Sequence, residues 1–303
     1  MELFLKRIAK VGAADIVIDS ITVVAGYNGS GKTTISKALY GMLQCSSSDE
    51  MDKAFIASEI ARLYSTQAIT HSYGDNTSEI SLRKGKNVLS FSLSEDGLAV
   101  NSYYPIGKDG NSLYFRAPSR WIDSDAEELK RALYRPSLNE KTALMESYKG
   151  MLEKYAKGTI KEHKGRLFYV DDDYPDFYIE LSNASSGAII LAEIGRLIDN
   201  GSIKEGTTLI IDEPETNLHP EKQVALARII VSLAVGHQIK FLLSSHNIYF
   251  IRALEVALAE EQEEMHRFYM MKQSDESHLY SSVDVTDDLE QIYHELYQPL
   301  EDL

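Results

Sequence analysis

Apolar and polar positions along the chain first follow the two-residue period of strands and then the longer period of a helix. Residues 2–8 alternate between apolar and polar side chains, and a shorter alternation covers 15–19. The apolar run 21–25 predicts a buried strand, and apolar residues within 35–43 recur every three to four positions. This opening stretch therefore predicts three strands followed by an amphipathic helix.

Short strands are expected again further along the chain. Alternating runs over 79–83, 88–93 and 98–103 are separated by turns that contain glycine. One more strand is expected over 113–117, where Pro118 ends it because proline donates no backbone hydrogen bond. The first three of these strands predict an antiparallel meander.

Helical spacing returns over 123–157, and two strands are expected at 166–170 and 177–181. The aspartates of 171–176 lie between these two strands. A metal site could be built from them, but a run of Asp with Pro175 is typical of a solvated turn. We therefore expect a turn and no metal there.

Helices and strands alternate from residue 188 onward. The expected elements are a helix over 188–199, a strand over 208–211, a helix over 221–235, a strand over 239–243, a helix over 251–260, strands over 267–271 and 279–283, and a helix from Thr286 to Pro299. Alternation of this kind builds a parallel sheet covered by helices.

The whole pattern predicts an α/β protein with a parallel sheet core, an antiparallel β lobe and a helical lobe. We expect one domain over 1–303 in three parts. These parts are an N-terminal lobe that includes the antiparallel strands (1–118), a helical insertion (119–165) and a C-terminal lobe (166–303).

The segment between the buried strand and the first helix has the pattern G-x-x-x-x-G-K-T, from Gly26 to Thr33. Glycines there let backbone N–H groups converge on phosphate oxygens, and the helix N-terminus favours anions. Lys32 would reach the β- and γ-phosphates of ATP, and the hydroxyl of Thr33 would ligate Mg²⁺. The residues expected to bind the nucleotide are Asn28, Gly29, Ser30, Gly31, Lys32, Thr33 and Thr34.

Two further strands end in chemistry that suits ATP hydrolysis. The apolar run 208–211 is followed by Asp212 and Glu213. Asp212 would hold Mg²⁺ through water, and Glu213 would polarise the attacking water. The run 239–243 ends in two serines and His246. In a doubly wound sheet this strand would lie beside the strand that ends at Asp212, so His246 could reach the γ-phosphate.

A fourth segment, Ser185-Ser186-Gly187, precedes the helix expected at 188–199. Small residues at a helix start can bind an anion through free N–H groups, although serine and glycine are also ordinary caps. The first three segments therefore carry most of the argument for a nucleotide site.

Composition is that of a globular protein, with 44% apolar and 25% charged residues. The single cysteine, Cys45, cannot form an internal disulfide, which suits a reducing compartment. The N-terminus lacks the apolar segment of a signal peptide, and Arg228 interrupts the apolar region 224–235. We expect a cytoplasmic protein that does not cross a membrane.

The net charge of −15 is unevenly distributed. Residues 255–303 hold fourteen acidic and two basic side chains, whereas 148–169 hold six basic and two acidic ones. The basic stretch is read as a solvated helix face, and a surface for DNA remains the alternative.

Together the four motifs resemble the ATP-binding-cassette (ABC) ATPase superfamily. They are similar to its soluble branch, which includes SMC-like and RecF-like proteins and the overcoming-lysogenization-defect (OLD) ATPases. The sequences of residues 212–220 (DEPETNLHP) and 244–247 (SSHN) look like the corresponding motifs of OLD-like proteins, and residues 285–293 look like the C-terminal tails of that group. The resemblance covers 1–43 and 177–303. It implies the ABC-type nucleotide-binding fold.

The resemblance also implies a mechanism. In this superfamily a signature segment completes the ATP site of the opposite subunit, so Ser185, Ser186 and Gly187 would act in trans. Ser185 matches the signature serine and Gly187 its second glycine, but Ala188 replaces the usual glutamine. The Q-loop falls either on Gln67 or on 116–120. The expected cofactors are ATP and Mg²⁺, held in a head-to-tail homodimer or a higher oligomer.

The superfamily contains several functions, and the sequence favours one. Related chains often carry a nuclease domain such as Toprim, which we expect to be absent here. We therefore expect ATP state to control a separate effector protein, a nuclease or toxin, in bacterial anti-phage defence. Alternatives are a DNA-repair or recombination ATPase, a transporter subunit, whose usual signature fits poorly, and a scaffold that does not hydrolyse ATP, against which Glu213 argues.

Overall fold

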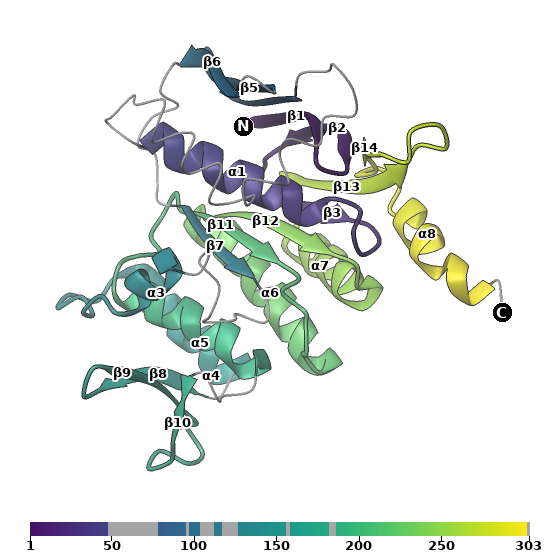
Figure 1. Ribbon diagram of the computed structural model, residues 1–303. Helices are drawn as coiled ribbons and strands as arrows, with labels where there is room; N and C mark the ends of the chain where they lie inside the picture. Colours follow the sequence, from purple (N-terminus) through teal and green to yellow (C-terminus); the bar gives the residue numbers. More distant parts are fainter. Residues whose placement is uncertain are drawn as a thin grey trace.

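The computed structural model describes residues 1–47, 78–94, 97–103, 112–116, 127–155, 158–181 and 186–301. Within them, eleven strands form one sheet in the order β6-β5-β4-β1-β2-β14-β13-β3-β12-β11-β7 (Figure 1). The strands are β1 (Glu2–Ile8), β2 (Val11–Val17), β3 (Ile21–Ala25), β4 (Ser78–Lys84), β5 (Asn87–Ser94), β6 (Gly97–Tyr103), β7 (Ser112–Arg116), β11 (Thr208–Asp212), β12 (Lys240–Ser245), β13 (His266–Gln273) and β14 (Tyr280–Asp284).

Half of this sheet is parallel, as the alternation of helices and strands predicts. Strands β7, β11, β12, β3 and β13 pair with one another in parallel. Asp212 is opposite Ser244, and Ser245 is opposite Ala25, so β11, β12 and β3 end at one edge of the sheet. The expectation that the strand before His246 lies beside the strand before Glu213 is confirmed.

The other half of the sheet is antiparallel. Strands β6, β5, β4, β1 and β2 pair with one another in antiparallel fashion. They join the parallel half through β14, which pairs in parallel with β2 and in antiparallel fashion with β13. The strand expected over 113–117 does not join this meander, because β7 lies at the opposite edge and pairs with β11. The antiparallel lobe and the parallel core predicted from the sequence therefore belong to one sheet.

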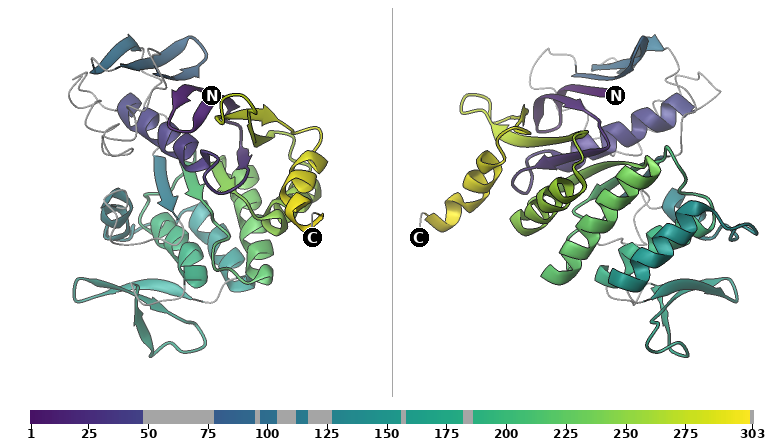
Figure 2. Two further views of the ribbon diagram at one scale, coloured as in Figure 1. Left: turned by 45° about the vertical axis from the view of Figure 1, so that its right-hand side comes forward. Right: turned by 180° about the vertical axis from the view of Figure 1, so that it is seen from behind.

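Helices cover both faces of the sheet (Figure 2). They are α1 (Lys32–Ser47), α3 (Glu127–Leu133), α4 (Ala143–Tyr155), α5 (Ser186–Asp199), α6 (Pro220–His237), α7 (Ile248–Glu261) and α8 (Glu290–Glu301). Alternate residues of β3 face different cores: Val24 packs in the cluster with α1, and Val23 packs in the cluster with α6 and α7. A strand buried on both faces needs a continuous apolar run, which 21–25 supplies.

A second, three-stranded sheet packs against α5. It consists of β8 (Thr159–His163), β9 (Arg166–Val170) and β10 (Tyr178–Glu180), in the order β10-β9-β8. Part of the basic stretch therefore lies on a β-hairpin, and the reading of 148–169 as a helix face is wrong beyond Tyr155. The hairpin crosses position 165, where the helical insertion was expected to end. The division into three parts stays a prediction.

Local chemistry changes the bounds of several expected elements. The second strand is Val11–Val17, because Val11, Ala14 and Ile16 are its buried positions. The last helix begins at Glu290, since the Thr286 hydroxyl accepts a hydrogen bond from the Phe268 amide instead of capping that helix. Pro299 lies within the helix and does not end it. Among the described helices, none is long and apolar enough to cross a membrane.

Candidate functional site

The glycine-rich loop connects β3 to α1 at the edge where the parallel strands end. Gly26, Gly29 and Gly31 have φ angles of 152°, 78° and 97°, a region that side chains with a Cβ rarely adopt. A Cβ on Gly31 would lie 2.6 Å from a methyl carbon of Val11, so this position has no room for one. The backbone of the loop can therefore approach a ligand closely, as a phosphate-binding loop requires.

Lys32 is buried beneath this loop, with 5% of its surface exposed. Its Nζ donates hydrogen bonds to the carbonyl oxygens of Gly26, at 2.8 Å, and Tyr27, at 2.9 Å. Burial lowers the pKa of the ammonium group, and the carboxylates of Glu213, Asp212 and Glu215 oppose this shift. The charge of Lys32 is thus held inside the loop, where phosphate oxygens can bind it.

Asp212 is in contact with the first turn of α1. Its Oδ2 accepts a hydrogen bond of 2.6 Å from Thr33 Oγ1, and its Oδ1 accepts one from Ser244 Oγ. Asp212 is 3% exposed, so both oxygens depend on these hydroxyl donors. A hydroxyl and a carboxylate this close together are hard oxygen ligands, and they fit Mg²⁺, which is bound by one or two protein oxygens together with substrate phosphates.

Glu213 and His246 face each other across the ends of β11 and β12. Oε1 of Glu213 lies 3.2 Å from Nδ1 of His246, which is ion-pair distance without the geometry of a hydrogen bond. The backbone N–H of Glu213 donates to Ser244 O at 2.9 Å, and its φ angle is 54°. Left-handed backbone costs a non-glycine residue about 1–2 kcal/mol, and such strain is concentrated at functional sites.

The comparisons with known proteins concern the family and the fold of the chain. A family model described as an AAA ATPase domain matches residues 116–251, a range that includes Asp212, Glu213 and His246. Among solved structures, the SMC head domain from Thermotoga maritima covers 94% of this chain and 98% of its own, with a TM-score of 0.52 and 14% identity. The chain has the fold of the SMC-like, ABC-type P-loop ATPases.

Two further SMC heads show the same ABC-type fold. One is a SmcHead bound to the C-winged helix domain of ScpA, with a TM-score of 0.57 and 12% identity over 96% of this chain and 98% of that one. The other is a Pyrococcus furiosus Smc head bound to the C-terminal domain of ScpA, with a TM-score of 0.58 and 12% identity over 99% and 98%. The search of curated proteins finds no match.

The residues expected to form the signature and the Q-loop are only partly described. Ser185 and Gln67 lie outside the described residues, and of 116–120 the structure describes only the backbone of Arg116, which pairs with Asp212. Helix α5 begins at Ser186 and includes Gly187, so the expected segment does lead into a helix. The roles of Ser185, Ser186 and Gly187 stay predictions.

Two residues near the candidate site were not identified from the sequence. Glu215 lies in the turn after β11, is 3% exposed, and accepts a 2.6 Å hydrogen bond from Ser245 Oγ. Lys10 lies in the turn between β1 and β2, and its Nζ would be 3.6 Å from a Cβ on Gly29. An acidic residue between Pro214 and Thr216 could have been suspected from the sequence, but nothing in the pattern indicated Lys10.

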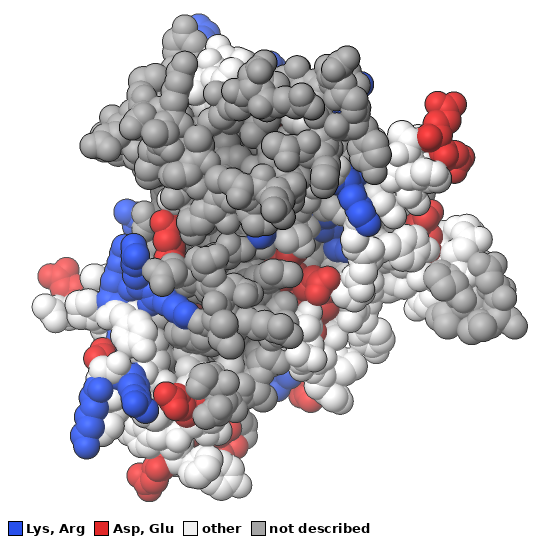
Figure 3. Space-filling model, viewed as in Figure 1, with Lys and Arg blue, Asp and Glu red and all other residues white. Residues whose placement is uncertain are grey.

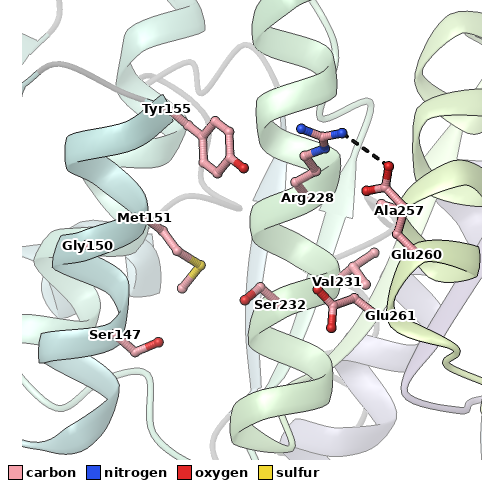
Figure 4. A pocket seen from close by; sticks show the side chains of 10 residues that line it. All are labelled: Ser147, Gly150, Met151, Tyr155, Arg228, Val231, Ser232, Ala257, Glu260 and Glu261. Carbon is pink, nitrogen blue, oxygen red and sulfur yellow. Dashed lines mark hydrogen bonds and ion pairs between the residues drawn. The ribbon is translucent and has the colours of Figure 1, made fainter.

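Other features lie away from this site. In the 171–176 turn, the Asp173 N–H donates to Asp171 Oδ1 at 2.9 Å, and no metal-binding group of His, Cys, Asp or Glu occurs in the described residues. A cavity of about 430 Å³ lies between α4, α6 and α7 (Figure 4). Arg228 and Glu260, 3.3 Å apart, form an ion pair in its lining. None of its lining residues belongs to the four motifs.

Proposed function

We propose that this protein binds Mg-ATP at the end of β3 and hydrolyses it. The observation that carries the proposal is the convergence of three strand ends. The phosphate loop, Asp212 with Glu213, and His246 come from segments far apart in the chain and meet at one edge of the sheet. Ligands in open α/β sheets bind at this edge, beyond the carboxyl ends of the strands.

Each side chain has a distinct part in the proposed reaction. The Lys32 ammonium binds the β- and γ-phosphates, and Thr33 and Asp212 supply the oxygens that hold Mg²⁺. Bound Mg²⁺ neutralises the charge that develops on the phosphate oxygens. Glu213 accepts the proton of the attacking water, and His246, 3.2 Å from it, orients the γ-phosphate and the base toward each other.

We further propose a head-to-tail homodimer or higher oligomer with shared sites. The segment Ser185-Ser186-Gly187 of one copy would contact the ATP held by the phosphate loop of another. Ser186 and Gly187 are the first two residues of α5, which supports this, because helix N-termini attract anions. ATP would then hold the two copies together, and hydrolysis would separate them.

The ATP state would control a separate effector protein in the cytoplasm. The resemblance of the motif sequences to OLD-like proteins favours a nuclease or toxin of an anti-phage system as this effector. Two observations support a protein partner. SMC heads with the same fold have been solved bound to domains of ScpA. Acidic side chains are also visible over the β13–β14 hairpin, a region that suits a basic protein surface (Figure 3).

One observation favours the DNA-repair alternative. Basic side chains gather over α3 and the β8–β9 hairpin in Figure 3. They include Lys130 and Arg131 of α3 and Lys161, Lys164 and Arg166 of the hairpin. Such a surface could follow a phosphate backbone. Its five cations are outnumbered by the fourteen acidic side chains after residue 254, and for that reason DNA is the less favoured partner.

The decisive experiment measures Mg²⁺-dependent ATP hydrolysis in wild type and in Glu213→Gln. The amide keeps the shape of the side chain but cannot accept the proton. Turnover should therefore fall at least ~100-fold while ATP binding is retained. Glu221→Gln is the matched control, since Glu221 is an exposed glutamate in the first turn of α6. Wild-type turnover in Glu213→Gln would show that Glu213 is not the base.

A further inference from the structure

The buried carboxyl group of Glu215 connects two loops of the site. Glu215 follows β11 in the same turn as Glu213, and its Oε1 accepts a 2.6 Å hydrogen bond from Ser245 Oγ at the end of β12. Ser245 is fully buried, and Glu215 is 3% exposed. This bond therefore links the loop after β11 to the loop after β12 inside the protein.

The hydroxyl of Ser245 is also hydrogen-bonded to the residue that caps α7. Its Oγ accepts a 3.0 Å hydrogen bond from the Asn247 N–H, and the Asn247 side chain caps α7 by accepting from the Phe250 N–H at 3.2 Å. His246 lies between these two residues in the chain. Its backbone is thus held at both ends by a network that begins at the carboxyl group of Glu215.

The side chain of the same histidine faces Glu213. His246 Nδ1 lies 3.2 Å from Glu213 Oε1, and no hydrogen bond in the described residues fixes Nδ1 in this place. The ring position therefore depends on how its backbone is held. A displacement of about 1 Å in such a contact can slow a reaction about 100-fold.

We propose that Glu215 is a positioning residue for ATP hydrolysis, and that its bond to Ser245 keeps His246 beside Glu213. This inference rests on the proposed ATPase function. Glu215 does not touch the nucleotide in this account, and it acts through the loop that carries His246. The second carboxyl oxygen, Oε2, has no hydrogen-bond partner among the described residues, so the neutral acid is favoured in this buried place.

Two substitutions break the link from opposite sides. Glu215→Ala removes the acceptor, and Ser245→Ala removes the donor without touching the turn after β11. Each should lower kcat for ATP at least about 10-fold and leave KM within about 2-fold, because the phosphate loop is unaffected. Glu215→Gln keeps a carbonyl oxygen for Ser245 and should recover most of the lost rate. Glu221→Ala on α6 is the matched control.

A measurement without nucleotide separates this inference from the ATPase proposal. In ¹⁵N-histidine-labelled protein, the His246 ring signals, assigned by their loss in His246→Gln, should shift in Glu215→Ala and in Ser245→Ala. They should keep the wild-type position in Glu215→Gln. Unchanged signals and rates in both alanine variants would overturn the inference, and so would a Glu215→Gln variant as slow as Glu215→Ala. A wild type without ATPase activity would refute the proposed function, and the His246 signals of the alanine variants would then still show whether Glu215 holds the His246 loop.

Discussion

Thr33 and Asp212 are 179 residues apart in the chain, and their side chains are joined by a hydrogen bond of 2.6 Å between Oγ1 and Oδ2. This bond links the first turn of α1 to the end of β11. It brings together the two residue types that hold Mg²⁺ in phosphoryl-transfer sites. The relationship predicts that the charge of Asp212 sets the requirement for Mg²⁺.

The prediction can be tested with Asp212→Asn, which preserves size and removes the negative charge. We expect the Mg²⁺ concentration for half-maximal ATP hydrolysis to rise at least about 10-fold, as it does when groups around a metal are altered. Chelation of Mg²⁺ should abolish hydrolysis in wild type. Asp288→Asn, at an exposed position before α8, should behave as wild type. An unchanged Mg²⁺ requirement in Asp212→Asn would remove Asp212 from the metal site.

A second prediction concerns the sharing of sites between copies. Ser185→Arg should leave ATP binding intact and abolish hydrolysis in the homodimer, whereas Lys32→Ala should weaken ATP binding itself. When the two variants are mixed, one site of each mixed dimer combines an intact loop with an intact signature. Part of the activity should therefore return. Failure to recover activity at any ratio, with mixed dimers confirmed by mass, would indicate a site completed within one chain.

A third prediction follows from the burial of Glu215. Burial raises the pKa of this carboxyl group from its usual value of 4.5 to about 7, against hydrogen bonds from the Ser245 hydroxyl and the His246 backbone. Between pH 4.5 and pH 7, Glu215 keeps its proton in the folded protein and has lost it in the unfolded chain. The contribution of this proton to the stability of the folded protein is fully present below pH 4.5 and is lost as the pH rises through 7.

Urea unfolding of wild type and Glu215→Gln between pH 4.5 and pH 8 measures this effect. The amide cannot ionise, so the free energy of unfolding of wild type should fall relative to the variant as pH rises. The raised pKa corresponds to about 3 kcal/mol over the whole interval. A constant difference between the two proteins across this range would mean that Glu215 ionises in the folded protein as it does in the unfolded chain.

The convergence of the motifs was predictable because apolar runs mark parallel strands and the motifs follow those strands directly. Asp212 and His246 come after buried runs, and parallel strands of one sheet end at one edge. The sequence could not show that Glu215 points inward, since an acidic residue after a proline has the pattern of an exposed turn. Glu215 can be buried because its carboxyl group accepts a hydrogen bond from Ser245, which belongs to another strand.

Strand β8 was missed for a different reason. Lys161, Glu162 and His163 are all exposed, so Ile160 is its only buried residue and no two-residue period is visible. The strand forms because it pairs with β9 and packs on α5, which are tertiary contacts. The prediction that Thr286 caps the last helix was wrong for a similar reason. Its hydroxyl accepts a hydrogen bond from the Phe268 amide and not from the end of a helix.

The last prediction distinguishes an effector protein from DNA as the partner of this protein. With the region after residue 254 carrying a net charge of −12, long-range electrostatics oppose a phosphate backbone and attract a basic protein surface. Isolation of the Glu213→Gln protein from native cells with ATP should therefore enrich one protein, which we expect to be a nuclease or another toxin. The same isolation with Lys32→Ala, which should bind ATP weakly, is the control.

The purified protein should bind duplex DNA only weakly at physiological salt, in the non-specific range of about 10⁻⁴–10⁻⁶ M. The residual binding should come from the β8–β9 hairpin, because Lys161 and Lys164 are two of its three exposed cations, with Arg166. Lys161→Glu/Lys164→Glu should remove it and leave ATP turnover unchanged, since the hairpin packs on α5 away from the phosphate loop. Tight, ATP-dependent DNA binding that these two substitutions abolish, with no protein partner recovered, would instead establish the DNA-repair reading.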